Sequence, residues 1–524
     1  MFEIELKFQV PAASRRAVDT AVGAGDSRRT RMQAIYFDTP DRRLAAAGLA
    51  LRLRKEGRRW AQTLKAAGPN AMQRFEDNAP LIGPMAVPAG AVPGVEPQRH
   101  AGTPVGELLA AALVPRKGET MAPRLVPLYR TDIWRRTRTL RAKGGTVELA
   151  FDHGEIVGGD RRLPVCELEI ELLRGRPGTV IDVARRWVRP HGLWLDVRSK
   201  AEQGDRLARD APLGTAVKAG AVQLERVMSA DAAMHAVVAQ CLQQILPNAS
   251  EIAGGRCSGE HVHQLRVGLR RLRSALRFFA GWTAPVDPCL PEQLTALFRQ
   301  LGVVRDRDAL AASLLPALRK AGAPLFELPP APAGPSPTEL LRSAEATMLL
   351  LDLLAQQVTT VAPAVPPRAG APPPTSATEH AGDRPPAAVP ALPRALVDAL
   401  AQHLQGWHRR VVQAAKHYAE LDDLARHTQR KRVKRLRYAA EFAGSLFKSK
   451  AVASYLKLLA PVQDSLGRYN DLCVGLETYR SAVGDDPRAW FAIGWLTARR
   501  DVLLAESIAA LNDFLHCKPF WKVG

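Results

Sequence analysis

The stretch FEIELKFQV, residues 2–10, decides how the first part of this chain folds. Charged and apolar side chains alternate along it, which is the period-two pattern of a β-strand with two different faces. Glu3, Glu5 and Lys7 fall on one face, and the apolar residues between them fall on the other. A solvated edge strand would explain such a face in isolation, so its meaning depends on whether neighbouring strands repeat it.

Four further segments repeat this alternation before about residue 210. They are LALRLRKE (49–56), RWAQTLKAA (59–67), TVELAFD (146–152) and VCELEIELL (165–173). Whole strand faces are acidic or basic by turns, which predicts a β-rich first domain whose polar faces share an interior. Divalent metals that bridge carboxylates to a polyphosphate held by Lys and Arg would require this arrangement.

The bulk composition limits the class of protein. With 524 residues the chain exceeds the usual size of one core, which predicts two to four domains. A formal charge of +21 predicts attraction to polyanions, whether nucleic acid, phosphate polymers or an acidic membrane surface. The six cysteines show no CxxC spacing, which supports neither a zinc site nor a disulfide framework. With no N-terminal signal and no apolar run of about 18 residues, we expect a cytoplasmic protein without a membrane partner.

From about Gln223 the apolar period becomes helical, and a Pro/Ala-rich stretch from about 359 to 393 is typical of an extended insertion. The two helical pieces are related in sequence. With His263 set against His427, HVHQLRVGLRRLRSALRFF (261–279) aligns without a slip in register to RHTQRKRVKRLRYAAEFAG (426–444). Each copy is followed by a second shared element, LGVVRDRDAL with Asp306 and LGRYNDLCV with Asp471. These matches indicate a duplicated helical unit.

Each copy places a basic stripe beside an apolar stripe on one helix. A charge run is usually only a solvated face, but a duplicated stripe in the same histidine register favours a surface for a long polyanion. A purely structural role for the two histidines stays open. Nucleic acid is the rival ligand, yet the stripes lack the interleaved aromatics of stacking-based recognition, so polyphosphate is the expected ligand. The stripe residues are His263, Arg266, Arg270, Arg273 and Arg277 in the first copy and His427, Arg430, Lys434 and Arg437 in the second.

The first ~210 residues resemble the CYTH, or triphosphate tunnel metalloenzyme, superfamily. The resemblance is carried by the ExExK start, YFDTPDRRLAAAGLALRLR (36–54), the strand lysine Lys65, ELEIEL (167–172) and RSKAEQG (198–204). The chain is similar in particular to bacterial inorganic triphosphatases that carry a helical extension. The resemblance implies a closed antiparallel eight-stranded barrel whose lumen is a tunnel, and hydrolysis or cyclisation of triphosphates with Mg²⁺ or Mn²⁺.

The resemblance also implies roles for individual residues of this chain. Glu3, Glu5, Lys7 and Lys65 would form the catalytic set. The implied metal ligands are Glu3, Glu5, Asp152, Glu167 and Glu169, while Glu148 and Glu171 share their strand faces. The implied triphosphate-binding residues are Lys7, Arg52, Arg54, Lys65, Arg74, Arg135 and Lys200. Glu76 also matches a family glutamate, and Arg130 and Arg136 remain alternatives to Arg135.

Residues 222–520 resemble the CHAD domain, a helical domain named for its conserved histidines. HQLRVGLRRLR (263–273) and the trailing LGVVRD and LGRYND carry this resemblance. It implies two four-helix bundles related by pseudo-symmetry and a basic surface that binds inorganic polyphosphate. The second copy departs from the pattern with Thr428 and Gln429 in place of Gln264 and Leu265, and with Glu441 in place of Arg277.

Together these patterns predict an α+β multidomain chain. A closed antiparallel eight-stranded β-barrel over 1–210 precedes an all-α domain of two pseudo-symmetric four-helix bundles over 222–520, with repeats at about 222–322 and 396–520. The predicted function is an inorganic triphosphatase dependent on Mg or Mn and coupled to a polyphosphate-binding domain. An adenylyl cyclase and a non-catalytic protein of polyphosphate granules are the alternatives. The expected location is the cytoplasm, with association to such granules left open.

Overall fold

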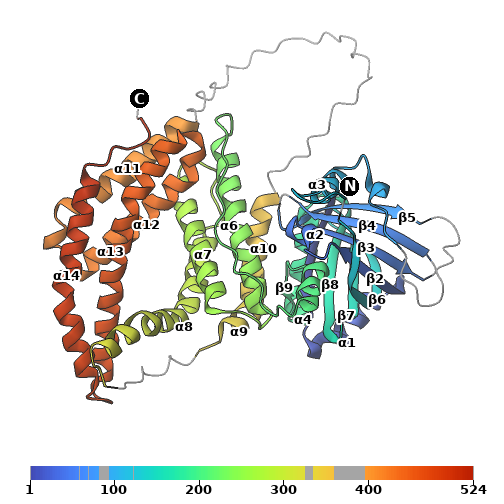
Figure 1. Cartoon of the computed structure of the whole chain (residues 1–524), viewed down its shortest axis with the longest axis horizontal. Helices are drawn as coiled ribbons and strands as arrows, with labels where there is room; N and C mark the ends of the chain where they lie inside the picture. Colours follow the sequence, from blue (N-terminus) through green and yellow to red (C-terminus); the bar gives the residue numbers. More distant parts are fainter. Residues whose placement is uncertain are drawn as a thin grey trace, which may run out of the picture. The chain divides into compact units, whose positions relative to one another are not determined.

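The structure is a computed structural model, shown in Figure 1. It describes residues 2–57, 59–68, 70–81, 94–121, 123–324, 334–358 and 396–522, without the side chains of Phe2, 303–309 and 311–313. The predicted insertion at about 359–393 lies outside this range. The chain folds into two compact units, one comprising 1–220, 238–273 and 286–355, the other 221–237, 274–285 and 356–524. The domain boundaries expected from the sequence stay predictions.

The first part of the chain is a closed antiparallel barrel. Its neighbouring strands pair in the order β5-β4-β3-β2-β6-β7-β8-β1, and β1 also pairs with β5, which closes the sheet. The predicted eight-stranded barrel is therefore confirmed, and the two-residue β9 (Trp194–Leu195) adds to β1 at one place. The barrel strands are β1 (Phe2–Gln9), β2 (Ser27–Asp38), β3 (Leu49–Glu56), β4 (Arg59–Ala67), β5 (Gln73–Pro80), β6 (Val126–Ala142), β7 (Gly145–Gly158) and β8 (Arg161–Gly175).

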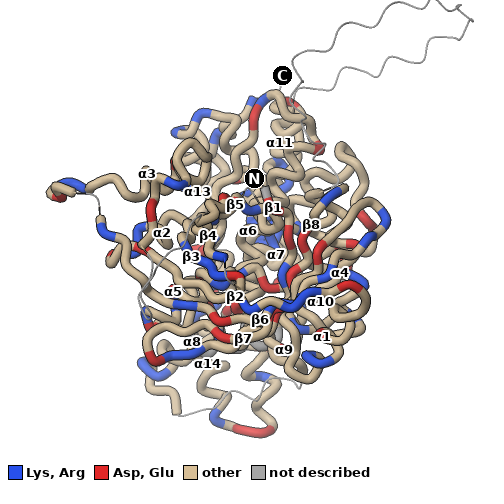
Figure 2. Tube along the Cα trace, turned by 90° about the vertical axis from the view of Figure 1, so that its right-hand side faces the viewer, with Lys and Arg blue, Asp and Glu red and all other residues tan. Residues whose placement is uncertain are grey.

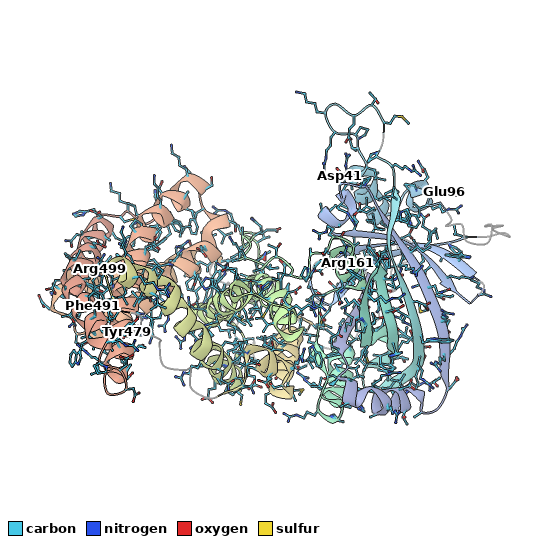
Figure 3. The ribbon with its side chains drawn as sticks, turned by 60° about the horizontal axis from the view of Figure 1, so that its bottom comes forward. Asp41, Glu96, Arg161, Tyr479, Phe491 and Arg499 are labelled. Atoms are coloured by element: carbon cyan, nitrogen blue, oxygen red, sulfur yellow. The ribbon has the colours of Figure 1, made fainter. Side chains whose placement is uncertain are left out.

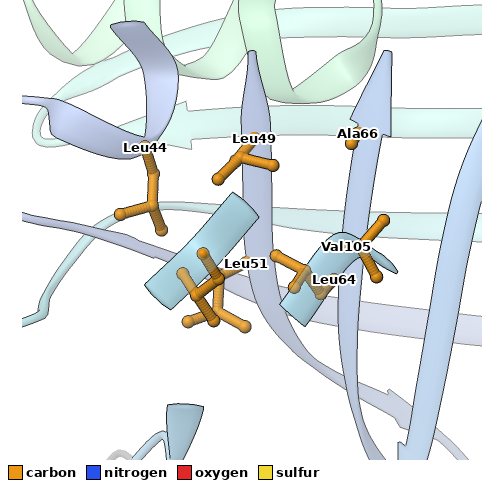
Figure 4. Close-up of a cluster of buried hydrophobic side chains, with 7 residues drawn as sticks. Leu44, Leu49, Leu51, Leu64, Ala66 and Val105 are labelled. Atoms are coloured by element: carbon orange, nitrogen blue, oxygen red, sulfur yellow. The ribbon is translucent and has the colours of Figure 1, made fainter. Parts of the chain in front are cut away.

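Helices cover the outside of the barrel, where the apolar strand faces need to be buried. Helix α1 (Arg15–Gly23) contacts β6 and β7, and α4 (Gly178–His191) contacts β8, β1 and β7. Helices α2 (Arg43–Ala46) and α3 (Pro104–Ala112) pack near β3 and β4. The cluster between them consists of Leu44, Leu49, Leu51, Leu64, Ala66, Val105 and Leu109 (Figure 4).

A buried carboxylate fixes the turn between β2 and β3. Asp38 accepts hydrogen bonds from the backbone N–H groups of Thr39 at 2.6 Å, Leu44 at 2.8 Å and Ala45 at 2.9 Å. It therefore satisfies donors at the start of α2 that would otherwise be buried without a partner. This is the structural role of the YFDTP segment, and it sets where β3 begins.

Helix α5 (Lys200–Ala208) contacts β6, β7 and β8. The side chain of Ser199 accepts a hydrogen bond from the N–H of Glu202 at 3.0 Å, so the helix begins at Lys200. At its other end, Leu207 packs on the apolar cluster of Ile133, Ile156 and Val165. These two anchors place Lys200 next to the inner face of the barrel.

The remainder of the described chain is helical, as predicted. The last four long helices pack as a four-helix bundle through the neighbours α11–α12, α12–α13, α13–α14 and α11–α14. None of the helices in the described residues is long and apolar enough to cross a bilayer. The helices are α6 (Ala230–Ala253), α7 (Gly259–Phe279), α8 (Cys289–Lys320), the short α9 (Pro337–Arg342), α10 (Ala344–Val358), α11 (Leu396–Lys416), α12 (Asp423–Ala443), α13 (Ser449–Ala482) and α14 (Ala489–Leu515).

The role of Asp38 can be tested by Asp38→Ala. The substitution leaves the N–H groups at the start of α2 without their acceptor, so we expect the free energy of unfolding to fall by about 2 kcal/mol. Urea unfolding followed by circular dichroism measures the change. Asp26→Ala is the matched control, because Asp26 is exposed in the turn before β2. Equal stability of the two variants would contradict this role.

Candidate active site

The charged strand faces point into the barrel, where they line one cavity of about 1260 Å³. Acidic and basic positions both occur along the barrel strands (Figure 2). Of the predicted metal and triphosphate residues, Glu167 alone is absent from the cavity wall, and 1% of its surface is exposed. The lining residues include Glu3, Glu5, Lys7, Arg52, Arg54, Lys65, Arg74, Arg135, Asp152, Glu169 and Lys200.

Three of the predicted metal ligands form one group. Asp152 on β7 and Glu167 on β8 are directly opposite in the antiparallel register, and Glu169 lies two residues further along β8. One carboxylate oxygen from each of the three lies within 4.8 Å of the others. Carboxylate oxygens are the donors that Mg²⁺ and Mn²⁺ prefer, so this acidic cluster fits a divalent cation.

Two cations hold the acidic cluster together. Arg135 donates to Asp152 at 2.6 Å and to Glu169 at 2.5 Å. The ammonium nitrogen of Lys200 lies 2.7 Å from each of these carboxylates and also contacts Glu167. Burial would lower the pKa of Lys200, but the three carboxylates raise it well above its ordinary value. Lys200 therefore stays charged inside the barrel.

Glu3 and Glu5 line the same cavity but are held by other ion pairs. Lys65 lies 2.8 Å from Glu3 and also contacts Glu76, while Arg74 lies 2.8 Å from Glu5. Burial raises the pKa of Glu3 to about 7, although Lys65 opposes the shift. Burial would also raise the pKa of Glu76, but attraction to Lys65 and Arg52 lowers it to about 2. The structure thus divides the five predicted metal ligands into one group of three and two separately paired carboxylates.

A row of like charges crosses three neighbouring strands. Glu5 on β1 lies opposite Glu171 on β8, which in turn lies opposite Glu148 on β7. Burial, followed by the charges of Glu3 and Glu5, raises the pKa of Glu171 to about 7. Like charges directly opposite on a sheet repel each other, so this row is costly unless a cation or a proton is taken up.

The structure separates the three arginines that compete on β6. Arg135 lines the cavity, whereas Arg136 bonds to Asp19 of α1 on the outer face at 2.8 Å. Arg130 is exposed and points to the same outer face, as the alternation along β6 requires. Arg135 is thus the one of the three that can reach a ligand in the lumen.

Sequence reasoning missed a polar group beside Glu167. The side-chain amide of Gln9 lies 3.3 Å from Glu167 and 3.1 Å from Asp196. Asp196 is fully buried and accepts hydrogen bonds from Arg198 at 2.9 and 2.7 Å. Gln9 could have been found, because it continues the alternation of Glu3, Glu5 and Lys7. Asp196 follows a two-residue strand and carries no such signal.

In the first helical repeat three of the predicted basic residues gather around one aromatic ring. The guanidinium groups of Arg266, Arg270 and Arg273 lie 5.0, 5.3 and 5.3 Å from the ring centre of Phe298 on α8. Cation–π contacts of this kind orient an arginine without removing its charge. Arg266 is buried, Arg270, Arg273 and His263 are half-buried, and Arg277 is exposed. Phe298 is a further residue that the sequence did not single out.

In the second repeat the basic residues contact polar and acidic side chains. His427 lies 2.5 Å from Asn470, and Arg430 lies 3.8 Å from Asp471. Arg437 pairs with Glu441 at 3.0 Å and donates to Gln463 at 3.2 Å, while Lys434 is half-buried. The side chain of Asp306, the counterpart of Asp471, lies outside the described residues. Alignment of the two stripes into one surface stays a prediction.

Comparison with known proteins identifies both parts. Residues 1–203 match the CYTH domain model, and residues 236–480 match the CHAD domain model. The chain therefore carries a CYTH domain followed by a CHAD domain, the fusion expected from its sequence. The CYTH superfamily is metal-dependent, and the acidic cluster in the barrel agrees with that property.

Individual relatives are more distant. Inorganic triphosphatase from Haemophilus influenzae is 28% identical over 172 residues, which cover 32% of this chain and 44% of that protein. The match thus spans less than half the length of this curated relative. Among solved structures, the CHAD domain from the plant Ricinus communis is 28% identical, with 59% of this chain and 99% of that chain covered and a TM-score of 0.45. A putative adenylyl cyclase from Hippeastrum, described as having a dominant triphosphatase activity, is 18% identical, with coverage of 40% and 95% and a TM-score of 0.28.

The repulsion in the acidic row predicts that Glu171→Gln stabilises the metal-free protein. The pKa of Glu171 rises from 4.5 to about 7 on folding, so stability is lost as pH increases through this interval. At pH 8 with chelator we expect the free energy of unfolding to rise by about 1 kcal/mol. Thermal unfolding at pH 5 and pH 8 measures the gain, which should shrink at pH 5.

Glu155→Gln is the control for this comparison, because Glu155 lies outside the barrel and pairs with Arg162 at 2.5 Å. It should give no gain at pH 8. A Glu171→Gln variant that is less stable than the parent at that pH would show that the row is not repulsive.

Proposed function

We propose that the barrel is a metal-dependent triphosphatase acting on inorganic triphosphate or a related small triphosphate, and that the helical domain binds inorganic polyphosphate. One observation carries the first half of this proposal. The acidic cluster of Asp152, Glu167 and Glu169 meets a cavity that is also lined by lysine and arginine side chains from several strands. A triphosphate bridged to a carboxylate-held cation needs both kinds of charge in one enclosed space.

The residues divide into two roles in this proposal. Asp152, Glu167 and Glu169 would hold Mg or Mn, with Glu3 and Glu5 as further ligands. A bound divalent cation would supply charge neutralisation of phosphate oxygens and a lower pKa for a coordinated water. The side chains that would grip the triphosphate are Lys7, Arg52, Arg54, Lys65, Arg74, Arg135 and Lys200.

Position and charge explain how these side chains would promote phosphoryl transfer. Arg52 is half-buried, and its guanidinium donates to the hydroxyl of Tyr36 at 3.1 Å, which fixes its direction in the lumen. Lys65 is held between Glu3 and Glu76. Phosphoryl transfer requires in-line positioning and charge stabilisation more than covalent participation of the protein. The proposal therefore needs no dedicated general base, and the catalytic set is Glu3, Glu5, Lys7 and Lys65.

The test of this activity is phosphate release from inorganic triphosphate, ATP and long-chain polyphosphate, each with Mg²⁺, with Mn²⁺ and with chelator. We expect metal-dependent release from the small triphosphates. Glu5→Ala should lower the rate by roughly 100-fold or more, because it removes one of the carboxylates proposed to hold the divalent cation. Glu155→Ala, outside the barrel, should retain the parent rate.

Three other outcomes would decide against this proposal. A parent-like rate in Glu5→Ala would remove Glu5 from the site. Cyclic AMP in place of phosphate from ATP would favour the adenylyl cyclase alternative. No release from any substrate, with polyphosphate still bound, would leave a non-catalytic protein that binds polyphosphate granules.

The helical half of the proposal rests on the match to the CHAD domain and on the basic residues of the two repeats. Around Phe298, three arginines are oriented by one ring, which favours a repeating anion over a specific base sequence. Inorganic polyphosphate is therefore the proposed partner, and nucleic acid is not expected. The proposed location is the cytoplasm, at polyphosphate granules where these are present.

Charge reversal tests the proposed binding of polyphosphate by the helical domain. Arg270→Glu combined with Arg273→Glu should weaken binding of long-chain polyphosphate at least 10-fold and flatten its dependence on salt, because fewer counterions are released. Phe298→Leu should weaken binding less, since it removes the ring that orients the arginines but leaves their charges. Fluorescence anisotropy with labelled polyphosphate at several salt concentrations measures both effects.

The control is Arg161→Glu on the barrel, labelled in Figure 3. Arg161 is exposed at the start of β8, far in sequence from the helical repeats. It should leave polyphosphate binding unchanged. An equal loss per reversed charge in Arg161→Glu and in the double variant would indicate attraction to net charge and not a defined site.

A further inference from the structure

Helix α6 contributes a buried acid to the first compact unit, where it meets the segment that follows β9. Glu251 lies 2.5 Å from Arg206 and 3.4 Å from Arg198, and 5% of its side chain is exposed. Next to it, the hydroxyl of Ser250 accepts a hydrogen bond from the N–H of Val197 at 3.0 Å. Glu251 therefore contacts Arg198 and Arg206, which lie on either side of Lys200 in the chain, and Ser250 holds the backbone just before them.

Arg198 connects this contact to the acidic cluster by side-chain hydrogen bonds. Its guanidinium binds both carboxylate oxygens of Asp196, which is fully buried. Asp196 also accepts from Gln9, and the same amide of Gln9 lies 3.3 Å from Glu167. The contacts run without a break from Glu251 through Arg198, Asp196 and Gln9 to Glu167.

The backbone of Arg198 provides a second connection. Its carbonyl oxygen accepts a hydrogen bond from the ammonium group of Lys7, which also lies 3.4 Å from Glu167. The position of Arg198 therefore decides how closely Lys7 approaches Glu167. If Arg198 moves away, Lys7 loses its carbonyl acceptor and is left to pair with Glu167 alone.

We propose that Glu251 is a positioning residue for the acidic cluster, so that the first helix of the helical domain sets the affinity of the barrel for its divalent cation. The proposal rests on the function proposed above. Loss of Glu251 would leave Arg198 and Arg206 without their shared buried partner. The rearrangement of Arg198 would bring Lys7 onto Glu167, where its ammonium group competes with a cation for the same carboxylate.

The structure offers a matched control for this ion pair. Asp352 on α10 lies 2.6 Å from Arg185 on α4, which likewise joins the barrel domain to a later helix within the same compact unit. Neither residue lines the cavity. Asp352→Asn therefore weakens attachment of the helices without touching the acidic cluster.

The experiment uses the full chain without triphosphate. Mn²⁺ is titrated into the parent, Glu251→Gln and Asp352→Asn, and free Mn²⁺ is measured by electron paramagnetic resonance. We expect about 10-fold weaker Mn²⁺ binding in Glu251→Gln, the size usual for residues that position metal ligands, and the parent affinity in Asp352→Asn. Equal affinities in all three proteins, or equal losses in both variants, would overturn the proposal.

A second variant covers the case in which Glu251→Gln does not fold. Ser250→Ala removes one hydrogen bond to Val197 and leaves every charge in place. Weaker Mn²⁺ binding at an unchanged melting temperature would support the proposal, and unchanged binding would refute it. The titration needs no turnover. A parent protein that binds Mn²⁺ but releases no phosphate would therefore contradict the proposed triphosphatase activity and not the role of Glu251.

Discussion

Confinement of opposite charges inside a closed barrel is the constraint on which the rest of this structure depends. Pairing of β1 with β5 closes the sheet, and the period of two then turns every second side chain inward. Charges in such a space lose water, so each needs a partner of opposite sign. Arg135 and Lys200 serve Asp152 and Glu169, while Lys65 serves Glu3. Burying these charges costs desolvation free energy. A charged ligand that can exchange with the internal partners offsets this cost.

Strand register ties the fold to the site. Glu167, Asp152 and Arg135 lie side by side on β8, β7 and β6 because the antiparallel pairing sets them opposite one another. A slip of one residue in β8 would turn Glu167 and Glu169 outward and bring apolar side chains into the lumen. The apolar outer face, buried under α4, excludes that alternative. Packing outside the barrel thus fixes the strand register that places the acidic cluster inside it.

The sequence predicted the parts of this design that follow from local alternation. β3 and β4 begin and end where their period of two begins and ends. The alternation is weaker along β2 and β6. Arg28 and Arg29 place arginines on both faces of β2, and Arg135 and Arg136 do the same on β6. The sequence could not predict that the metal ligands divide into a group of three and two separate pairs, because this depends on which strands become neighbours when the barrel closes. The contact of Glu251 with Arg198 joins residues that are far apart in the chain, so no local sequence pattern predicts it.

The two helical segments that the sequence predicts to be repeats differ in the charges along their stripes. A shared histidine register predicted equivalent basic stripes, and the contacts of one aligned pair, Arg273 and Arg437, can be compared. Phe298 orients Arg273 through its ring, whereas Gln463 accepts a hydrogen bond from Arg437. Glu441 stands where the first copy has Arg277, so the second stripe exchanges a cation for an anion and pairs it with Arg437. The second stripe therefore carries less positive charge at the end where the first has an exposed arginine.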